Sequence, residues 1–163
     1  MKLGSTLFLR IAVNLIGVPI LALCIFGLPR IAIEAFAQTG RGSEFTYVVL
    51  GILFLMYISA IPFYFALYQA LKLLRYIDKN EAFSQISVKA LKNIRSCAIL
   101  ISVFYMVALP FIYVVAEWDD APGLIVIGLI ITFASMVIAV FAAVLKKLLQ
   151  EAIDIKSEND LTV

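Results

Sequence analysis

The sequence predicts an all-α integral membrane protein, a four-helix bundle built from two antiparallel hairpins. Hydrophobic residues make up 64% of the chain and charged residues 15%, whereas soluble domains are nearer half apolar and a quarter charged. The mean hydropathy is +1.06. The apolar residues gather in four runs, each close to or above the roughly 20 residues that a bilayer requires. A water-soluble core could not bury this much apolar surface in 163 residues, so lipid is expected to cover part of it.

The chain is predicted to form a single membrane domain, residues 1–163. The membrane spans are expected at about residues 11–28, 47–74, 98–116 and 124–145. Between the first two spans, residues 29–44 are expected to be a connector that begins at Pro29 and turns at Gly40 to Ser43. A longer connector, residues 75–97, follows the second span, and a tail, residues 146–163, follows the fourth.

The long connector is predicted to contain an amphipathic helix that leads into the third span. Ser84 is a good N-cap for it, and Ile86, Ala90 and Ile94 recur every four residues. Its lysines lie on other faces, toward solvent or anionic lipid headgroups. Beyond the fourth span, Leu145 begins a row of apolar residues at helical spacing, so this helix is expected to leave the membrane as a stalk. A polar tail then follows, which could fold onto the basic connector.

Basic residues predict the topology. If the termini and the long connector share one side, that side holds all but Arg30 and Arg41 of the 13 Lys and Arg residues. The positive-inside rule places this rich side in the cytoplasm. The sequence therefore predicts a multi-pass protein of the cytoplasmic (inner) membrane with both termini inside. Arg10 is expected to extend to the nearby interface.

The residue inventory argues against several functions. The chain has no histidine and two cysteines, which excludes a zinc cluster of Cys and His and any His-based catalytic triad. The predicted spans contain no ionisable residue between their interfacial ends, which disfavours ion pumps and proton-coupled carriers. We therefore predict no catalytic residue, cofactor or metal site, and no direct contact with nucleic acid.

Prolines in the first three spans suggest a possible pocket. Pro19, Pro62 and Pro110 each remove a backbone donor and can kink a helix. One interpretation is a pocket between the kinked helices for a lipid-like or peptide ligand. The other is that the prolines only shape helix packing. The pocket would be lined by Asn14, Pro19, Pro62, Pro110 and the tyrosines Tyr57, Tyr64 and Tyr105. Asn14 on its own is expected to join helices by hydrogen bonding.

The fourth span carries small residues along one face. They are spaced by four, three, four and four positions: Gly128, Thr132, Ser135, Ala139 and Ala143. Small faces allow helix backbones to approach closely. The face is expected to pack within the bundle, with a homodimer interface as the alternative.

Two segments carry a resemblance to a known family. Residues 80–94, NEAFSQISVKALKNI, and residues 155–163, IKSENDLTV, resemble the bacterial family known as domain of unknown function 2975. The resemblance implies a small four-span protein of the bacterial cytoplasmic membrane, without assigned activity, whose gene often neighbours one for a helix-turn-helix regulator. It implies no catalytic residue.

These observations favour a regulatory or interaction protein that binds a cytoplasmic partner, for which the helix-turn-helix regulator is a candidate. A lipid-like or peptide ligand in the proline pocket is the alternative. The expected partner-binding residues are Asn80, Glu81, Phe83, Ser84, Lys89 and Lys92 in the connector and Glu158, Asn159, Asp160 and Leu161 in the tail.

Overall fold

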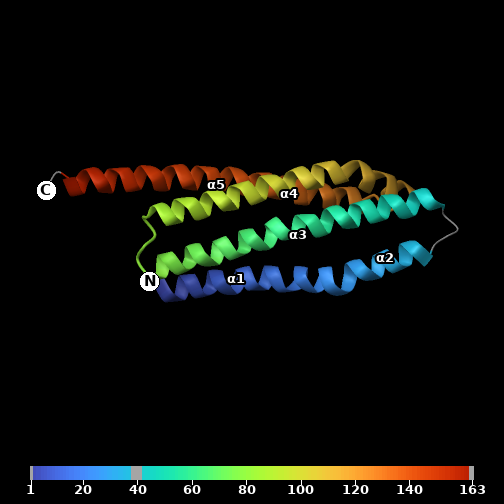
Figure 1. Ribbon diagram of the computed structural model, residues 1–163, viewed down its shortest axis with the longest axis horizontal. Helices are drawn as coiled ribbons and strands as arrows, with labels where there is room; N and C mark the ends of the chain where they lie inside the picture. The colour runs from blue at the N-terminus through green and yellow to red at the C-terminus, as the bar shows by residue number, and fades with distance from the viewer. Residues whose placement is uncertain (1, 38–41, 162–163) are drawn as a thin grey trace.

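The computed structural model describes residues 2–37 and 42–161, and every regular element in them is helical (Figure 1). The order is α1 (Lys2–Ala22), η1 (Leu23–Gly27), α2 (Leu28–Ala37), α3 (Ser43–Asp78), α4 (Gln85–Trp118) and α5 (Gly123–Leu161). Within these ranges, four helical rods are long and apolar enough to cross a membrane, with α1, η1 and α2 forming the first rod. The predicted all-α membrane fold is confirmed.

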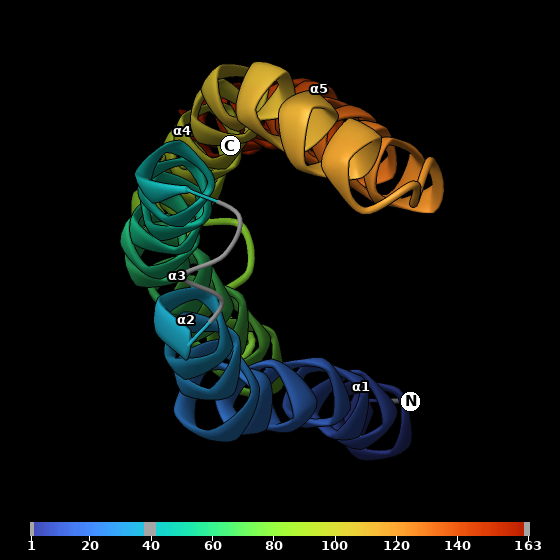
Figure 2. The ribbon, with the colours of Figure 1, turned by 90° about the vertical axis from the view of Figure 1, so that its right-hand side faces the viewer.

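The helices form an open arc (Figure 2). Helix α4 packs along both α3 and α5, and α3 in turn packs on α1 and α2. Helices α1 and α5 lie at the two ends of the arc, so each has a side that no other helix of the described chain covers. We call the end that holds the N-terminus, the turn at residues 79–84 and the last turns of α5 the connector end. The opposite end, with the turn at residues 119–122, is the distal end (Figure 1).

The first rod stays helical past Pro29, where the sequence predicts that a connector begins. The helix continues through Pro29 to Ala37. A proline inside an α-helix lacks an N–H and its ring collides with the carbonyl four residues earlier. Here the preceding turn, η1, widens to a π-helix, and the N–H of Leu28 bonds to the carbonyl of Leu23. Such a bulge relieves the collision without ending the helix. The predicted turn residues Gly40 and Arg41 lie outside the described residues.

Helix α3 ends in a hydrogen-bonded turn. Asn80 has a φ of 58°, the N–H of Glu81 bonds to the carbonyl of Tyr76 at 2.8 Å, and the N–H of Asn80 bonds to that of Ile77 at 3.2 Å. This pattern is a Schellman motif, which favours Asn or Gly at its left-handed position. The same motif ends α4, with Asp120 at a φ of 51°.

Helix α4 begins where the sequence predicts, but its buried face differs. Ser84 is the N-cap residue, and the connector helix and third span form one continuous helix. Of the predicted apolar row, Ala90 is buried, Ile94 is half-buried and Ile86 is 50% exposed. The buried face also includes Ser87, Val88 and Leu91. Ser87 is buried because its hydroxyl turns back and donates to the carbonyl of Glu81.

The fourth rod runs further than expected. Where a polar tail was expected after the stalk, α5 is helical to Leu161 and continues past the start of α4 (Figure 1). It does not fold back onto the connector. All four rods extend beyond the predicted spans, so the membrane boundaries within them stay predictions.

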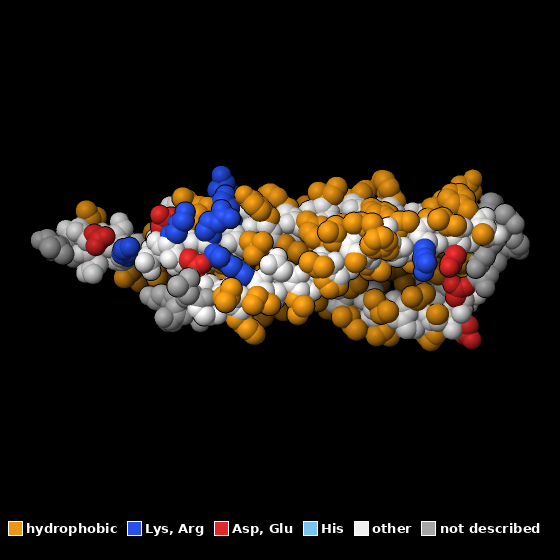
Figure 3. All heavy atoms as spheres, turned by 90° about the horizontal axis from the view of Figure 1, so that it is seen from below, with side chains coloured by type: hydrophobic (Ala, Val, Ile, Leu, Met, Phe, Trp, Pro, Cys, Tyr) orange, Lys and Arg blue, Asp and Glu red, His pale blue; other side chains and the backbone are white. Residues whose placement is uncertain are grey.

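A cluster of buried apolar side chains lies toward the distal end. It includes Leu28 and Ala35 from the first rod, Phe45 and Leu53 from α3, and Val115 from α4. The ring of Phe45 also packs against that of Trp118, with centroids 5.3 Å apart. Outside this cluster, hydrophobic side chains cover the middle of the surface, as expected for contact with lipid (Figure 3).

Candidate functional site

Several hydrogen bonds hold the connector turn, residues 79–84. Beyond the Schellman motif, the Ser84 hydroxyl donates to the carbonyl of Glu81 at 2.7 Å, and Ser87 donates to the same carbonyl at 3.3 Å. The backbone carbonyl of Ser84 accepts the first N–H bonds of α4. Ser84 therefore holds the N-cap position that the sequence predicts, but its side chain stabilises the turn and does not cap the helix. The first resembling segment, residues 80–94, consists of this turn and the start of α4.

Most predicted partner-binding residues are at the surface. Asn80, Glu81, Lys89 and Lys92 are exposed, as is Phe83 at 59%, while Ser84 is half-buried. In the stalk the four predicted residues, Glu158, Asn159, Asp160 and Leu161, are all exposed. The two groups stand apart, because α5 continues past the connector turn (Figure 1).

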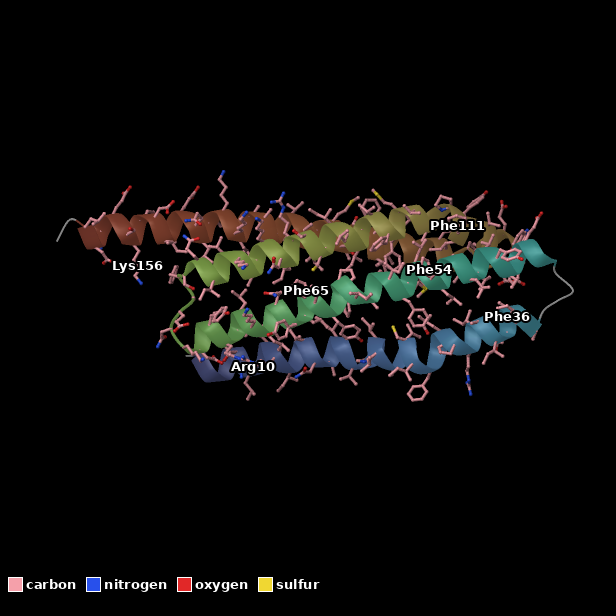
Figure 4. All side chains as sticks on the ribbon, in the orientation of Figure 1. Arg10, Phe36, Phe54, Phe65, Phe111 and Lys156 are labelled. Atoms are coloured by element: carbon pink, nitrogen blue, oxygen red, sulfur yellow. The ribbon has the colours of Figure 1, made fainter. Side chains whose placement is uncertain are left out.

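At the connector end, an ion pair that the sequence did not predict joins α1 to α3. Arg10 donates from its Nη2 to Oδ2 of Asp78 at 2.6 Å. The Arg10 side chain is 39% exposed and that of Asp78 17%, so the pair is partly shielded from water. Arg10 therefore has a specific partner on α3, where we expected only an extension to the interface. Figure 4 shows Arg10 at the connector end of α1 and Lys156 on the projecting part of α5.

Two tyrosines of α3 hold the first rod at mid-length. Tyr57 donates to the carbonyl of Cys24, and Tyr64 donates to that of Gly17, both at 2.8 Å. Cys24 lies in the π-turn. In a π-helix a carbonyl accepts from the N–H five residues later, and for Cys24 that residue is Pro29, which has no N–H. The Tyr57 hydroxyl therefore satisfies an acceptor that the proline leaves without a backbone donor.

The predicted proline pocket and the observed cavity are in different places. Asn14, Pro19 and Pro110 are exposed and Pro62 is half-buried, and none of these four lines the cavity found between the helices. Of the three predicted tyrosines, Tyr105 lines it.

The observed cavity lies toward the distal end, between α2, α3, α4 and α5. Its volume is about 350 Å³, within the range typical of small-molecule sites. Apolar residues form most of its wall, including the buried Ala35 and Ala108. The polar side chains on its wall are Glu34, Tyr105 and Asp119. A hollow among hydrophobic side chains is visible toward this end in Figure 3. The cavity could not be predicted from the sequence because it depends on which helix faces meet.

The small-residue face of α5 packs inside the chain. Gly128, Thr132, Ser135 and Ala139 are buried and Ala143 is half-buried. A Cβ on Gly128 would lie 3.0 Å from Leu109 of α4, so the glycine permits close contact between these helices. The hydroxyls of Thr132 and Ser135 donate to carbonyls four residues earlier on α5. One chain thus already covers this face. A homodimer through it stays a prediction.

No group of three or more potential metal ligands occurs in the described residues. The arrangement of four long apolar rods, a cavity among them and a projecting helix defines a multi-pass membrane protein.

Comparison with known proteins agrees with this class. The family model described as "Protein of unknown function (DUF2975)" matches residues 9–163, so the chain belongs to the DUF2975 family. The resemblance seen in the sequence is thereby confirmed. The chain is also 64% identical over 159 residues to the "Uncharacterized membrane protein YoaS" of Bacillus subtilis (strain 168), and the alignment covers 98% of each chain. No solved structure matches it.

Proposed function

We propose that this protein is a non-enzymatic interaction protein of the bacterial cytoplasmic membrane, and that its connector end lies in the cytoplasm and binds a protein partner. The orientation rests on the basic residues: all but Arg30 and Arg41 of the 13 Lys and Arg residues belong to segments at the connector end. Cytoplasmic loops carry such an excess. The lack of histidine and of ionisable groups inside the predicted spans supports a role without catalysis.

The projecting part of α5 carries the proposal. Every residue of this helix from Asp154 to Leu161 is exposed, whereas Leu149, Gln150, Ala152 and Ile153 are half-buried. Apolar side chains remain on it: Leu148 is 56% exposed, Ile155 66% and Leu161 83%. Exposed apolar residues on a helix that has left the lipid mark a contact surface.

The spacing of these residues indicates the kind of partner. Leu145, Leu148, Ala152 and Ile155 are separated by three, four and three positions, which places them in one stripe along the helix. This is the spacing that packs one helix against another. We therefore propose a partner that offers an amphipathic helix. The helix-turn-helix regulator suggested by the family resemblance is the first candidate.

The test is binding between the purified partner and the full-length protein in nanodiscs. The candidate regulator should bind the intact chain, and L148Q/I155Q or deletion of residues 158–163 should weaken binding at least roughly tenfold, because interface anchors carry most of the affinity. The matched control is K147Q/D154N, which changes two exposed residues about 100° around α5 from Leu148 and Ile155, outside the stripe and at constant net charge. Equal binding by the intact and altered stalks would contradict the proposal.

A second function, ligand binding, is favoured by the distal cavity. Its apolar wall suits a hydrocarbon chain, and the carboxyl groups of Glu34 and Asp119 would face a polar headgroup. The ligand is of the lipid-like class expected from the sequence, but its proposed site is the distal cavity and not the pocket between the prolines.

Filling the cavity tests this second function. Ala108 is 2% exposed and lines the cavity, so a phenylalanine there would occupy it. Native mass spectrometry should show an amphiphile retained by the wild type and lost from A108F. The control A134F makes the same change at an exposed position of α5. Retention of the amphiphile by A108F would contradict the assignment.

A further inference from the structure

Asn14 is a polar side chain that the fold leaves on the outside of α1. It is exposed, and the described residues provide no hydrogen bond to it. It lies one turn beyond Arg10, about 6 Å along the helix axis, inside the first apolar rod. An amide in hydrocarbon without a partner is costly, and such groups in membrane helices pair with other helices. Asn14 was expected to join helices, but it bonds to no other helix among the described residues.

The neighbours of Asn14 form a regular stripe. Leu7 is 58% exposed, Ile11 56%, Val18 65% and Leu21 47%. Together with Asn14 they are separated by four, three, four and three positions. This is the heptad pattern in which two helices pack side by side, and a single Asn within it fixes the register of the pair.

The stripe is separate from the side of α1 that binds α3. That side carries the buried Thr6 and Gly17, and Gly17 accepts the bond from Tyr64. Each residue turns an α-helix by about 100°, so the stripe through Asn14 lies roughly a quarter of a turn away. Helix α1 stands at one end of the arc, where it can bind α3 and a further helix at once (Figure 2).

We propose that two copies of the chain pair through α1, with this stripe as the interface and the two Asn14 amides hydrogen-bonded to each other. A carboxamide has both donors and an acceptor, so it is complementary to its own copy. Two copies with the same topology present Asn14 at the same depth, on parallel helices related by a two-fold axis. Helix α1 is therefore better suited to self-association than the small face of α5, which α4 covers.

Energy transfer between full-length chains in phosphatidylcholine vesicles tests this dimer. Gly4 is exposed at the start of α1, and a Cβ there would meet no atom within 4 Å, so G4C in a C24A/C97A background is a suitable labelling position. Diluting the chains with lipid gives a dissociation constant. We expect N14L to raise it roughly threefold to thirtyfold, the range of interhelical hydrogen bonds in membranes.

Two further variants separate the amide from general effects. N14Q keeps an amide in the stripe and should retain most of the affinity. The double variant N14L/L15N keeps the composition but turns the amide out of the stripe, and it should behave like N14L. Oxidative crosslinking should join V18C to its copy, whereas I16C, on the opposite side of α1, should not crosslink.

Four results would overturn the proposal: no energy transfer from the wild type at any lipid dilution, equal dissociation constants for the wild type and N14L, full affinity in N14L/L15N, and crosslinking of I16C in place of V18C. A dimer formed through α5 would show itself as energy transfer that does not depend on Asn14.

Discussion

The two ends of the molecule are held together in different ways. At the distal end, buried side chains from α2, α3 and α4 pack around the cavity. At the connector end, apolar residues such as Leu74, Val88 and Leu91 are also buried, but polar contacts join the chain there as well: the Arg10–Asp78 ion pair and the hydrogen-bonded turn after α3. Buried apolar groups contribute more stability than partly exposed ion pairs. We infer that buried apolar side chains provide most of the stability of the fold, while the polar contacts at the connector end fix which surfaces reach the water.

The largest expected effect comes from the distal cluster. Phe45 is 5% exposed and its ring packs against that of Trp118. F45A removes a buried aromatic ring and leaves a void, which typically costs about 3 to 5 kcal/mol. Thermal unfolding in detergent should show a clear fall in stability, and F54A, at a 65% exposed position of the same helix, is the control. Equal stability of F45A and F54A would contradict the inference that buried apolar side chains provide most of the stability.

A smaller effect is expected where the first rod meets α3. A Cβ on Gly17 would lie 3.1 Å from Cδ1 of Leu67, so a larger side chain must push the helices apart. G17L should cost about 1 to 3 kcal/mol, the usual range for overpacking, and it should also weaken the Tyr64 bond to residue 17. The same unfolding assay measures it, with G4L, in open space, as the control. Unchanged stability of G17L would show that α1 does not depend on this contact.

The ion pair at the connector end should matter less. D78N removes the charge that binds Arg10, and a partly exposed pair contributes about 1 kcal/mol or less. The loss should shrink at high salt, which screens exposed charges. The neighbouring exposed acid Glu81 gives the control, E81Q. A loss of stability in D78N as large as that in F45A would contradict the inference that buried apolar side chains provide most of the stability.

The smallest effect is expected at the π-turn. Y57F removes the donor to the Cys24 carbonyl and should cost about 1 kcal/mol or less, as for a single hydrogen bond that is partly exposed. Hydrogen exchange of the backbone around residues 24–28 should increase in Y57F. Y68F, at another exposed tyrosine of α3, provides the comparison, and equal exchange in both variants would leave the π-turn independent of Tyr57.

Sequence patterns predicted the features that depend on local composition. Long apolar runs predicted the four rods, and Ser84 predicted the start of α4. The helix continues past Pro29, contrary to expectation, because the preceding turn widens to a π-helix and so accommodates the proline ring. The spacing of Ile86, Ala90 and Ile94 predicted the connector helix, but it did not identify Ser87, whose hydroxyl donates to the carbonyl of Glu81 in the adjacent turn, as a buried residue.

Features that join distant residues could not be read from the sequence. Arg10 and Asp78 are 68 positions apart, and nothing in either neighbourhood identifies the other as its partner. The cavity likewise requires knowledge of which faces of α2, α3, α4 and α5 meet. Asn14 was recognised as a polar group in an apolar run, but only the fold shows that its own chain provides no partner among the described residues.

The orientation of the two ends is the claim on which the proposed function depends most. Single cysteines at S157C on the α5 stalk and D120C in the distal turn, each in a C24A/C97A background, can be labelled in intact bacteria with a membrane-impermeant maleimide. We expect D120C to react from outside and S157C to react only after the cells are opened. Labelling of S157C in intact cells would place the stalk outside and contradict a cytoplasmic partner.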